Sequence, residues 1–334
     1  MDLCVEKVVR IHGLVPRLCD PEAIVAVVAE TCAIVLGRPV PKDDVLLRLK
    51  RLSGYVASLA RLLESPGIPQ RTEAWYAARE NMVTGSELAS AMTKSSRKQF
   101  FKRKLAGPSA WDDMKDKPAI KWGVKYEPVA CVLYSRRNAA TVHEFGLLAH
   151  PGIKGFGASP DGISDLGIML EIKCPYSRVI TGEVPQAYWA QVQSQLDTTG
   201  LEECDFLEVK LEEYESAEEF DKDGGSTGLS ANGMEKGAVW KTDDEHEVIV
   251  GGGPEALDWA AARPGSNFWR LVVYSCVRIR RDDTYIRGLA PEIESVVSDI
   301  ARYRSDPDAV EKDYPAASPK ASWGDIPSFA FLGH

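Results

Sequence analysis

The chain has 334 residues, of which 44% are hydrophobic and 27% are charged, as in a soluble globular protein with one large domain or two smaller ones. The net charge is −9, from 40 basic and 49 acidic residues, so a nucleic-acid partner would have to meet a local basic surface. No uninterrupted apolar run is long enough to cross a bilayer, so we expect no transmembrane helix in this sequence.

Targeting and redox signals favour an intracellular protein. The most apolar segment, residues 23–36, is interrupted by Glu30 and Thr31 and predicts a buried helix. The first residues do not resemble a secretory signal. The seven cysteines are scattered without a CxxC pair, which favours reduced thiols and argues against zinc or iron–sulfur ligation.

Helical patterns fill the first 70 residues. Residues 21–36 and 41–63 carry apolar side chains at helical spacing, and Gly-Pro signals separate and end these runs. No residue pattern in this region suggests chemistry. We therefore expect residues 1–70 to form a helical region that covers the main domain or binds a partner.

Strand and helix signals mix over residues 71–215, which predicts an α/β or α+β fold for a domain that we expect to extend to residue 304. Within it, residues 216–265 are rich in Gly, Ser and acidic residues, which predicts an insertion or long loop. Residues 268–280 have a strand pattern, and residues 291–303 have a helical one. We expect residues 305–334 to be a mobile C-terminal tail.

A predicted hairpin between residues 155 and 173 is the most informative part of the chain. Two strand-like runs flank turn residues at positions 165–167. Folding about this turn places Asp161 opposite Glu171. It also places Ser159 opposite Lys173, on the face that Glu171 shares.

This hairpin would bring two carboxylates and an ammonium group together. Adjacent carboxylates repel each other unless a cation lies between them, and a hard divalent ion such as Mg²⁺ binds oxygen ligands, including the carbonyl of Ile172. Lys173 can then polarise an anionic substrate or steady a water. The group fits metal-assisted phosphodiester hydrolysis. The alternative is a surface hairpin with solvated charges.

A phosphate-binding turn is predicted upstream. Residues 84–87 (TGSE) fit a capping box at the start of a helix, and free N–H groups there suit phosphate. Ser86 can add a hydroxyl, and Arg79 can add a bidentate guanidinium. The alternative is ordinary capping with a surface arginine. Trp75 is predicted to be a core residue.

Two helices and one histidine can bring further polar groups to the hairpin. Glu127 lies on a mostly apolar helix face and needs a metal or a basic partner if buried, although a first-turn glutamate can also be stabilised by the helix dipole. Tyr188, Gln191 and Gln195 share the polar side of another helix, unless these glutamines simply face solvent. His150 precedes Asp161 closely enough to reach the same site, although a lone histidine is more often structural.

The strongest basic run is residues 94–104, with six basic residues and no acid. Its interleaved Phe100 and Phe101 predict a helix that buries two aromatic rings and presents basic side chains to DNA. The alternative is ordinary solvated charge. The candidate DNA-binding residues of this run are Lys98, Lys102 and Arg103.

With these residues in view, the sequence resembles the lambda-exonuclease/YqaJ-type viral recombinase family of PD-(D/E)xK nucleases, in a form like that of large-DNA-virus members. The resemblance covers roughly residues 71–215 and resumes near residues 268–285. It implies a restriction-endonuclease-like core with a mixed central sheet flanked by helices. It rests on residues 155–175 (GFGASPDGISDLGIMLEIKCP), Trp75 and Arg79 with Thr84–Ser86, the helix around Glu127, and Tyr188 with Gln191.

The resemblance assigns metal chemistry to the hairpin. Asp161 and Glu171 would be the metal ligands, with the Ile172 carbonyl assisting, and Lys173 would be the catalytic lysine. Some relatives carry another aspartate about ten residues before the SPDG motif. His150 stands near that place, which makes it a candidate substitute ligand and leaves open whether one ion or two bind.

The resemblance also assigns substrate contacts. Glu127 would support the second metal region, and Gln191 would position water or substrate. A terminal 5′-phosphate would be gripped by Arg79, Ser86, Ser159 and Arg178, with Tyr188 beside the DNA.

The expected function is a Mg²⁺-dependent 5′→3′ exonuclease, with Mn²⁺ as a substitute, that acts on duplex DNA ends in viral recombination, repair or replication. A single-strand annealing protein is the expected partner. Family members are ring-shaped trimers or monomers, so a homo-oligomer stays open. The alternatives are a structure-specific endonuclease on the same core, or a noncatalytic DNA-binding protein.

Overall fold

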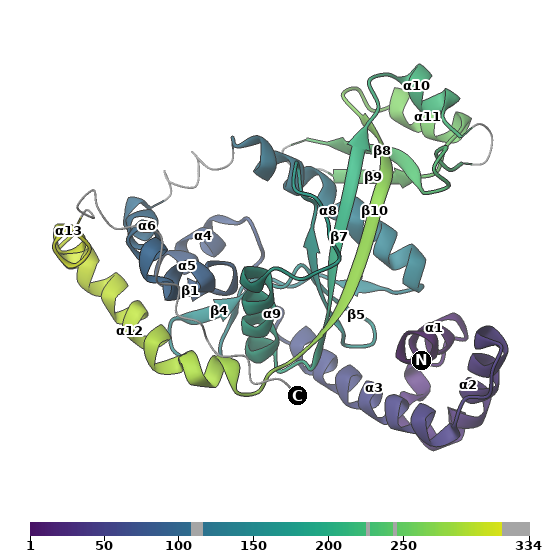
Figure 1. Cartoon of the computed structure of the whole chain (residues 1–334), viewed down its shortest axis with the longest axis horizontal. Helices are drawn as coiled ribbons and strands as arrows, with labels where there is room; N and C mark the ends of the chain where they lie inside the picture. Colours follow the sequence, from purple (N-terminus) through teal and green to yellow (C-terminus); the bar gives the residue numbers. More distant parts are fainter. Residues whose placement is uncertain (108–115, 225–227, 243–245, 316–334) are drawn as a thin grey trace.

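The computed structural model describes residues 1–107, 116–224, 228–242 and 246–315 (Figure 1). Its centre is a mixed sheet in which β6 and β7 run parallel and the other neighbouring strands run antiparallel. This arrangement confirms the predicted α/β fold with a mixed central sheet. The seven strands, in spatial order, are β2 (Val142–His143), β5 (Gly162–Ser164), β6 (Met169–Lys173), β7 (Glu203–Glu213), β10 (Asn267–Arg280), β8 (Lys236–Lys241) and β9 (His246–Val250).

Two helices, α8 (Pro118–Asn138) and α9 (Gln186–Thr199), cover opposite faces of the sheet (Figure 1). Alternate residues of a strand point to opposite faces, so Leu170 and Ile172 of β6 join the core under α8. Met169 joins the core under α9 instead. Glu171 has the same parity as Met169 and therefore faces α9.

A second, small sheet corrects part of the predicted hairpin. Its order is β1 (Val83–Thr84), β4 (Phe156–Ala158) and β3 (Leu148–Ala149), with β1 and β4 parallel. The run expected to be the hairpin's first strand is therefore β4 of this sheet, and the hairpin begins only at β5. Pro160 separates the two strands because it has no N–H to donate to a ladder. The expected pairing of Ser159 with Lys173 is wrong.

Helices surround the small sheet and share one hydrophobic core with it. The predicted helix over residues 291–303 is present but begins at Tyr285, with Pro291 inside it. Residues 305–315 do not form a mobile tail, because Ala309 and Val310 are buried in this core; residues 316–334 lie outside the described residues. The helices that contribute to this core include α5 (Leu88–Met92), α6 (Lys94–Ala106), α12 (Tyr285–Ser305) and α13 (Ala309–Asp313). Along the chain, α4 (Glu73–Glu80) and η2 (Gly85–Glu87) stand before and after β1.

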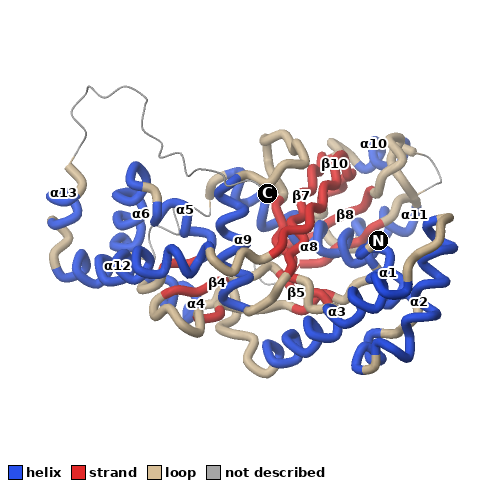
Figure 2. Tube along the Cα trace, turned by 60° about the horizontal axis from the view of Figure 1, so that its bottom comes forward, coloured by secondary structure: helices blue, strands red, loops and turns tan. Residues whose placement is uncertain are grey.

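The first 70 residues are helical, as predicted, and lie at the opposite end of the molecule from α6 and α13 (Figure 2). Their core takes in Leu166 and Ile168 from the hairpin turn. A buried ion-pair cluster adds to this contact, since Arg48 lies 2.7 Å from Glu203 on β7. The elements are α1 (Asp2–Ile11), η1 (Val15–Cys19), α2 (Pro21–Leu36) and α3 (Lys42–Leu63). None of the described helices combines the length and apolar character needed to cross a bilayer.

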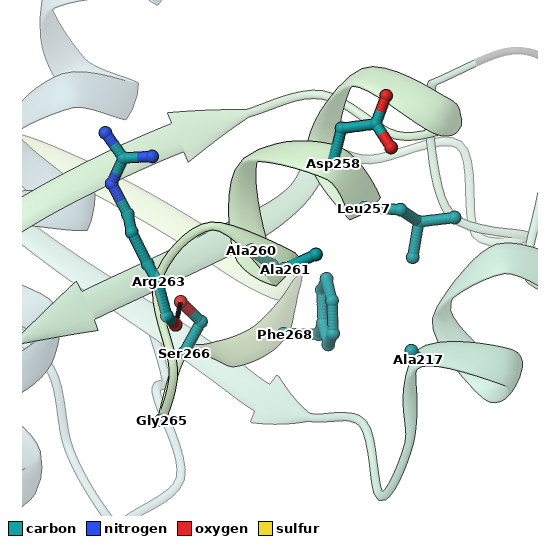
Figure 3. Close-up of a pocket in the computed structure, with 9 residues that line it drawn as sticks. All are labelled: Ala217, Leu257, Asp258, Ala260, Ala261, Arg263, Gly265, Ser266 and Phe268. Atoms are coloured by element: carbon teal, nitrogen blue, oxygen red, sulfur yellow. Dashed lines mark hydrogen bonds between the residues drawn. The ribbon is translucent and has the colours of Figure 1, made fainter.

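The segment 216–265 is folded rather than a long loop, which corrects that part of the prediction. Its strands β8 and β9 extend the main sheet beyond β10. Its helices α10 (Ala217–Lys222) and α11 (Pro254–Ala261) border a surface cavity of about 390 Å³ over Phe268 (Figure 3). Arg263 at this cavity is paired with Glu247, and no residue of the predicted site lines it.

Candidate active site

The register of the β5–β6 hairpin places the two predicted metal ligands opposite each other. Gly162 pairs with Leu170, so Asp161 and Glu171 are the next residues in register, as predicted. The Ile172 amide donates to Asp161 Oδ2 at 2.7 Å. Gly167 adopts φ +70° in the turn, where a Cβ would lie 2.3 Å from the Tyr55 carbonyl oxygen, so only glycine fits.

The Glu171 carboxylate is fully buried and held at both oxygens. Gln191 Nε2 donates to Oε1 at 2.7 Å, and Gln195 Nε2 donates to Oε2 at 2.7 Å. The Lys173 ammonium forms an ion pair with Oε1. Glu171, Lys173 and Gln191 thus converge as predicted, and Gln195, which the sequence placed on the same polar helix side, joins them.

The site carries more negative than positive charge. Burial, followed by the Glu171 and Glu127 carboxylates, raises the pKa of Asp161 well above its usual range. Burial alone would lower the pKa of Lys173, but the Glu171 and Asp161 carboxylates outweigh it and raise that pKa. Lys173 therefore stays protonated at neutral pH and offsets only part of the charge of these carboxylates.

These groups fit a hard divalent cation. Mg²⁺ typically uses one or two carboxylates and completes its shell with waters and substrate phosphates. Asp161, Glu171 and the Ile172 carbonyl offer that all-oxygen set beside excess negative charge. Among the described residues, no three His, Cys, Asp or Glu side chains converge as a ready-made metal cage. The site therefore suits an ion shared with substrate rather than a closed structural metal.

Glu127 lies on α8 at the edge of this site. Arg71 Nη2 lies 3.2 Å from its Oε1, and a third of the Glu127 side chain is exposed. Burial by the surrounding protein raises the pKa of Glu127, and Arg71 and Lys173 oppose that shift. Arg71 has φ +64°, a conformation that non-glycine residues seldom adopt outside functional or strained sites.

His150 is engaged elsewhere, so the structure does not support its expected role as a metal ligand. Its Nδ1 accepts hydrogen bonds from the Gly152 and Ile153 amides at 3.0 and 2.9 Å. The proton therefore lies on Nε2, which is 2.8 Å from Asp197 Oδ2. With both ring nitrogens occupied, His150 stabilises a turn.

Trp75 connects three residues that were predicted to bind phosphate, namely Arg79, Ser86 and Ser159. Arg79 is buried, and its Nη2 donates to Ser86 Oγ at 3.2 Å. Its guanidinium carbon lies 4.3 Å from the centre of the Trp75 ring. Trp75 Nε1 donates to Ser159 Oγ at 3.1 Å. The prediction that Trp75 is a core residue missed this bridging role, which its position one helical turn before Arg79 could have indicated.

A buried ion pair lies beside these three residues (Arg79, Ser86 and Ser159), which we call the candidate phosphate pocket. The predicted capping box is present, with Glu87 accepting from the Thr84 amide and hydroxyl. Lys104 Nζ lies 2.7 Å from Glu87 Oε2 and donates to the Arg79 carbonyl at 2.7 Å. Lys104 therefore fixes the main chain that carries Arg79, a role that its place in a basic run concealed.

Two cationic side chains, Lys173 and Arg178, lie near the ring of Tyr188 on α9. Lys173 Nζ lies 5.1 Å from the centre of its ring, and the Arg178 guanidinium lies 5.6 Å from it. Arg178 also forms an ion pair with buried Glu208. The structure thus places Arg178 and Tyr188 beside the candidate catalytic lysine.

Several basic side chains of helix α6 form ion pairs or hydrogen bonds with other residues of this chain. Lys98 and Lys102 each lie 2.6 Å from a carboxylate oxygen of Glu311 on α13. Arg103 donates to Ser90 Oγ at 3.3 Å. Phe100 and Phe101 are buried, as predicted. The expected DNA-facing role of these basic residues is therefore not supported by their contacts.

Proteins of large DNA viruses are similar in sequence to this chain. An uncharacterized protein of Acanthamoeba polyphaga mimivirus is 32% identical over 231 residues, which are 62% of this chain and 42% of that protein. A protein of African swine fever virus is 28% identical over 158 residues, which are 38% of this chain and 45% of that protein. The chain spans less than half the length of these relatives.

Two solved exonuclease structures are similar to this chain. An alkaline exonuclease from Laribacter hongkongensis has 25% identity and a TM-score of 0.46, covering 72% of this chain and 99% of that one. A phage related exonuclease from Haemophilus somnus has 13% identity and a TM-score of 0.38, covering 68% of this chain and 95% of that one.

The family model described as a YqaJ-like viral recombinase domain matches residues 74–202. This match takes in both the candidate phosphate pocket and the hairpin, which are the parts on which the resemblance was based. Residues 74–202 are therefore similar to a YqaJ-like viral recombinase domain, and the viral relatives agree with that similarity.

Proposed function

We propose that this chain is a metal-dependent DNA exonuclease that hydrolyses phosphodiester bonds from duplex ends in the 5′→3′ direction. The supporting observation is that helix α9 joins two sites. Gln195 donates to Glu171 of the hairpin at 2.7 Å and to the Ser159 carbonyl of the candidate phosphate pocket at 3.2 Å. A terminal phosphate held in the pocket would bring a nearby phosphodiester to the hairpin.

Asp161, Glu171 and the Ile172 carbonyl would hold a divalent ion such as Mg²⁺, for which Mn²⁺ would substitute. When bound, such an ion lowers the pKa of a water and neutralises charge on the phosphoryl group. The position of Glu127, within electrostatic reach of Asp161, suits support of a second ion.

The protein's own groups supply orientation and charge. Gln191 and Gln195 each hold one oxygen of Glu171, so this carboxylate cannot rotate away from the site. Lys173, kept protonated by its neighbours, would donate to a phosphate oxygen as charge develops there. The Arg79 guanidinium, already ordered on the Trp75 ring, would bind the terminal phosphate.

The proposed role is viral DNA recombination, repair or replication inside the host cell, and the matching family description, a viral recombinase domain, supports the first of these. Duplex ends would be the substrate, and a single-strand annealing protein would receive the exposed strand. Both follow from the proposed exonuclease, because resection of one strand leaves the other unpaired.

The test compares wild type with Asp161→Asn and Lys173→Met on linear duplex DNA. Wild type should degrade the DNA with Mg²⁺ and not with EDTA, and each variant should lose about 10³-fold in rate. Glu64→Gln, on an exposed helix end, is the matched control and should keep full activity. Full activity of the folded Asp161 or Lys173 variant would contradict the proposal.

A further inference from the structure

The loop that follows β6 exposes apolar side chains beside the candidate active site. In the described parts of residues 64–315, the large hydrophobic side chains that are well exposed are Tyr176, Val179 and Leu229. Two of them lie in this one loop, with Tyr176 52% and Val179 76% exposed. Tyr176 follows the candidate catalytic Lys173 by only three positions. The loop that directly follows the strand of Lys173 therefore offers apolar contact surface to a ligand.

The Tyr176 ring is ordered before any ligand arrives. Its edge packs against Trp122, with ring centres 5.5 Å apart and planes at 65°. Trp122 in turn packs on Tyr126 at 4.4 Å. The main chain is also fixed, because Lys210 Nζ donates to the Tyr176 carbonyl at 2.7 Å. An ordered ring loses little conformational entropy on binding.

Three basic residues belong to this loop or contact it. Lys173 ends the preceding strand, Arg178 lies within the loop, and Lys210 donates to the Tyr176 carbonyl. An exposed aromatic ring beside cations is the combination that binds single-stranded nucleic acid, since bases stack on the ring while phosphates meet the charges.

We propose that Tyr176, backed by Trp122 and flanked by Val179, stacks an unpaired nucleobase of the DNA strand whose phosphodiester reaches Lys173. This inference rests on the proposed nuclease function, which supplies the strand. It adds a contact to bases next to the predicted contacts to phosphate. The contact is independent of base sequence, because every base offers an aromatic face.

The test measures binding of a single-stranded oligonucleotide with one 2-aminopurine to the full chain in EDTA, where no cleavage is expected. Wild type should bind the oligonucleotide and quench the 2-aminopurine emission. Tyr176→Ala should bind about tenfold more weakly and lose the quenching, and Tyr176→Phe should keep both. Leu229→Ala removes an exposed side chain elsewhere and should match wild type.

The outcomes separate this inference from the proposed function. If Tyr176→Ala binds and quenches like wild type, the inference is wrong even where linear DNA is degraded normally. If binding depends on Tyr176 but no variant or wild type cleaves DNA with Mg²⁺, the inference stands and the nuclease proposal fails. Absence of any DNA binding by wild type would overturn the inference and leave the loop to a protein partner.

Discussion

Gln195 Nε2 lies 2.7 Å from Glu171 Oε2, and the same nitrogen donates to the Ser159 carbonyl at 3.2 Å. One buried amide therefore connects a candidate metal ligand to the candidate phosphate pocket. Helix α9 also packs tightly against η2, since a Cβ on Gly85 would lie 2.4 Å from Ser194 Oγ. The position of α9 thus sets the spacing between the two parts of the site.

Gln195→Leu should lower kcat for linear duplex DNA by about 10- to 100-fold, because it removes a hydrogen bond to a charged group. KM should change less, since Arg79 is untouched. Gln193→Leu is the control, because Gln193 lies on the same helix but donates to the Arg280 carbonyl. Steady-state kinetics with folding checked by circular dichroism would show this split. An equal loss in both variants would indicate a general effect on α9.

Arg79→Ala should remove the preference for a 5′-phosphate over a 5′-hydroxyl end, because the buried guanidinium is the strongest anion-binding group of the pocket. The loss should be about 10- to 100-fold on phosphorylated ends and much smaller on hydroxyl ends. Arg38→Ala, at an exposed position after α2, should leave both rates unchanged. Equal losses on both kinds of end would show that Arg79 does not read the phosphate.

Glu311→Gln should tighten binding to duplex DNA, because it releases Lys98 and Lys102 from their shared carboxylate. The plot of log affinity against log salt should become steeper by about 1 to 2. Fluorescence anisotropy at several salt concentrations would measure this change. Lys98→Ala with Lys102→Ala should hardly weaken wild-type binding. A large loss in that double variant would restore the DNA-binding role predicted from the sequence.

Acid should weaken the contact between the N-terminal helices and the sheet. Burial would raise the pKa of Glu203, but Arg48 and Arg278 outweigh it and lower that pKa to about 2 from 4.5. The associated stability is present above pH 4.5 and is lost as the pH falls towards 2. It amounts to about 3 kcal/mol at pH 7.

Urea denaturation of wild type and Glu203→Gln at several pH values tests this statement. The difference in free energy of unfolding should be largest near pH 7 and should shrink below pH 4. Glu202→Gln is the neighbouring control, because the Glu202 side chain is 44% exposed and pairs with Arg281 at the surface. A difference that does not change with pH would contradict the assigned pKa.

The sequence predicted the features that depend on local geometry. The turn at residues 165–167 determines the register of the hairpin, so Asp161 and Glu171 could be paired by counting. The capping box at residues 84–87 is also local, and the structure confirms it. Strand and helix periodicity likewise indicated the mixed α/β fold.

The sequence failed where contacts between distant segments decide the structure. Residues 156–158 pair with β1 rather than with residues near Lys173, and no local pattern encodes that choice. The basic run suggested that Lys104 is a surface cation, but it is buried and forms an ion pair with Glu87 of another helix. His150 looked available, but the amides of its own turn and Asp197 take both nitrogens.

The most direct measurement of the central claim is digestion of three DNA substrates with Mg²⁺ and with EDTA. The substrates are a linear duplex with 5′-phosphates, the same duplex with 5′-hydroxyls, and a closed circle. The proposed mechanism predicts Mg²⁺-dependent loss of the phosphorylated linear duplex, slower loss of the hydroxyl form and an intact circle. Cutting of the circle, or binding without any digestion, would contradict it.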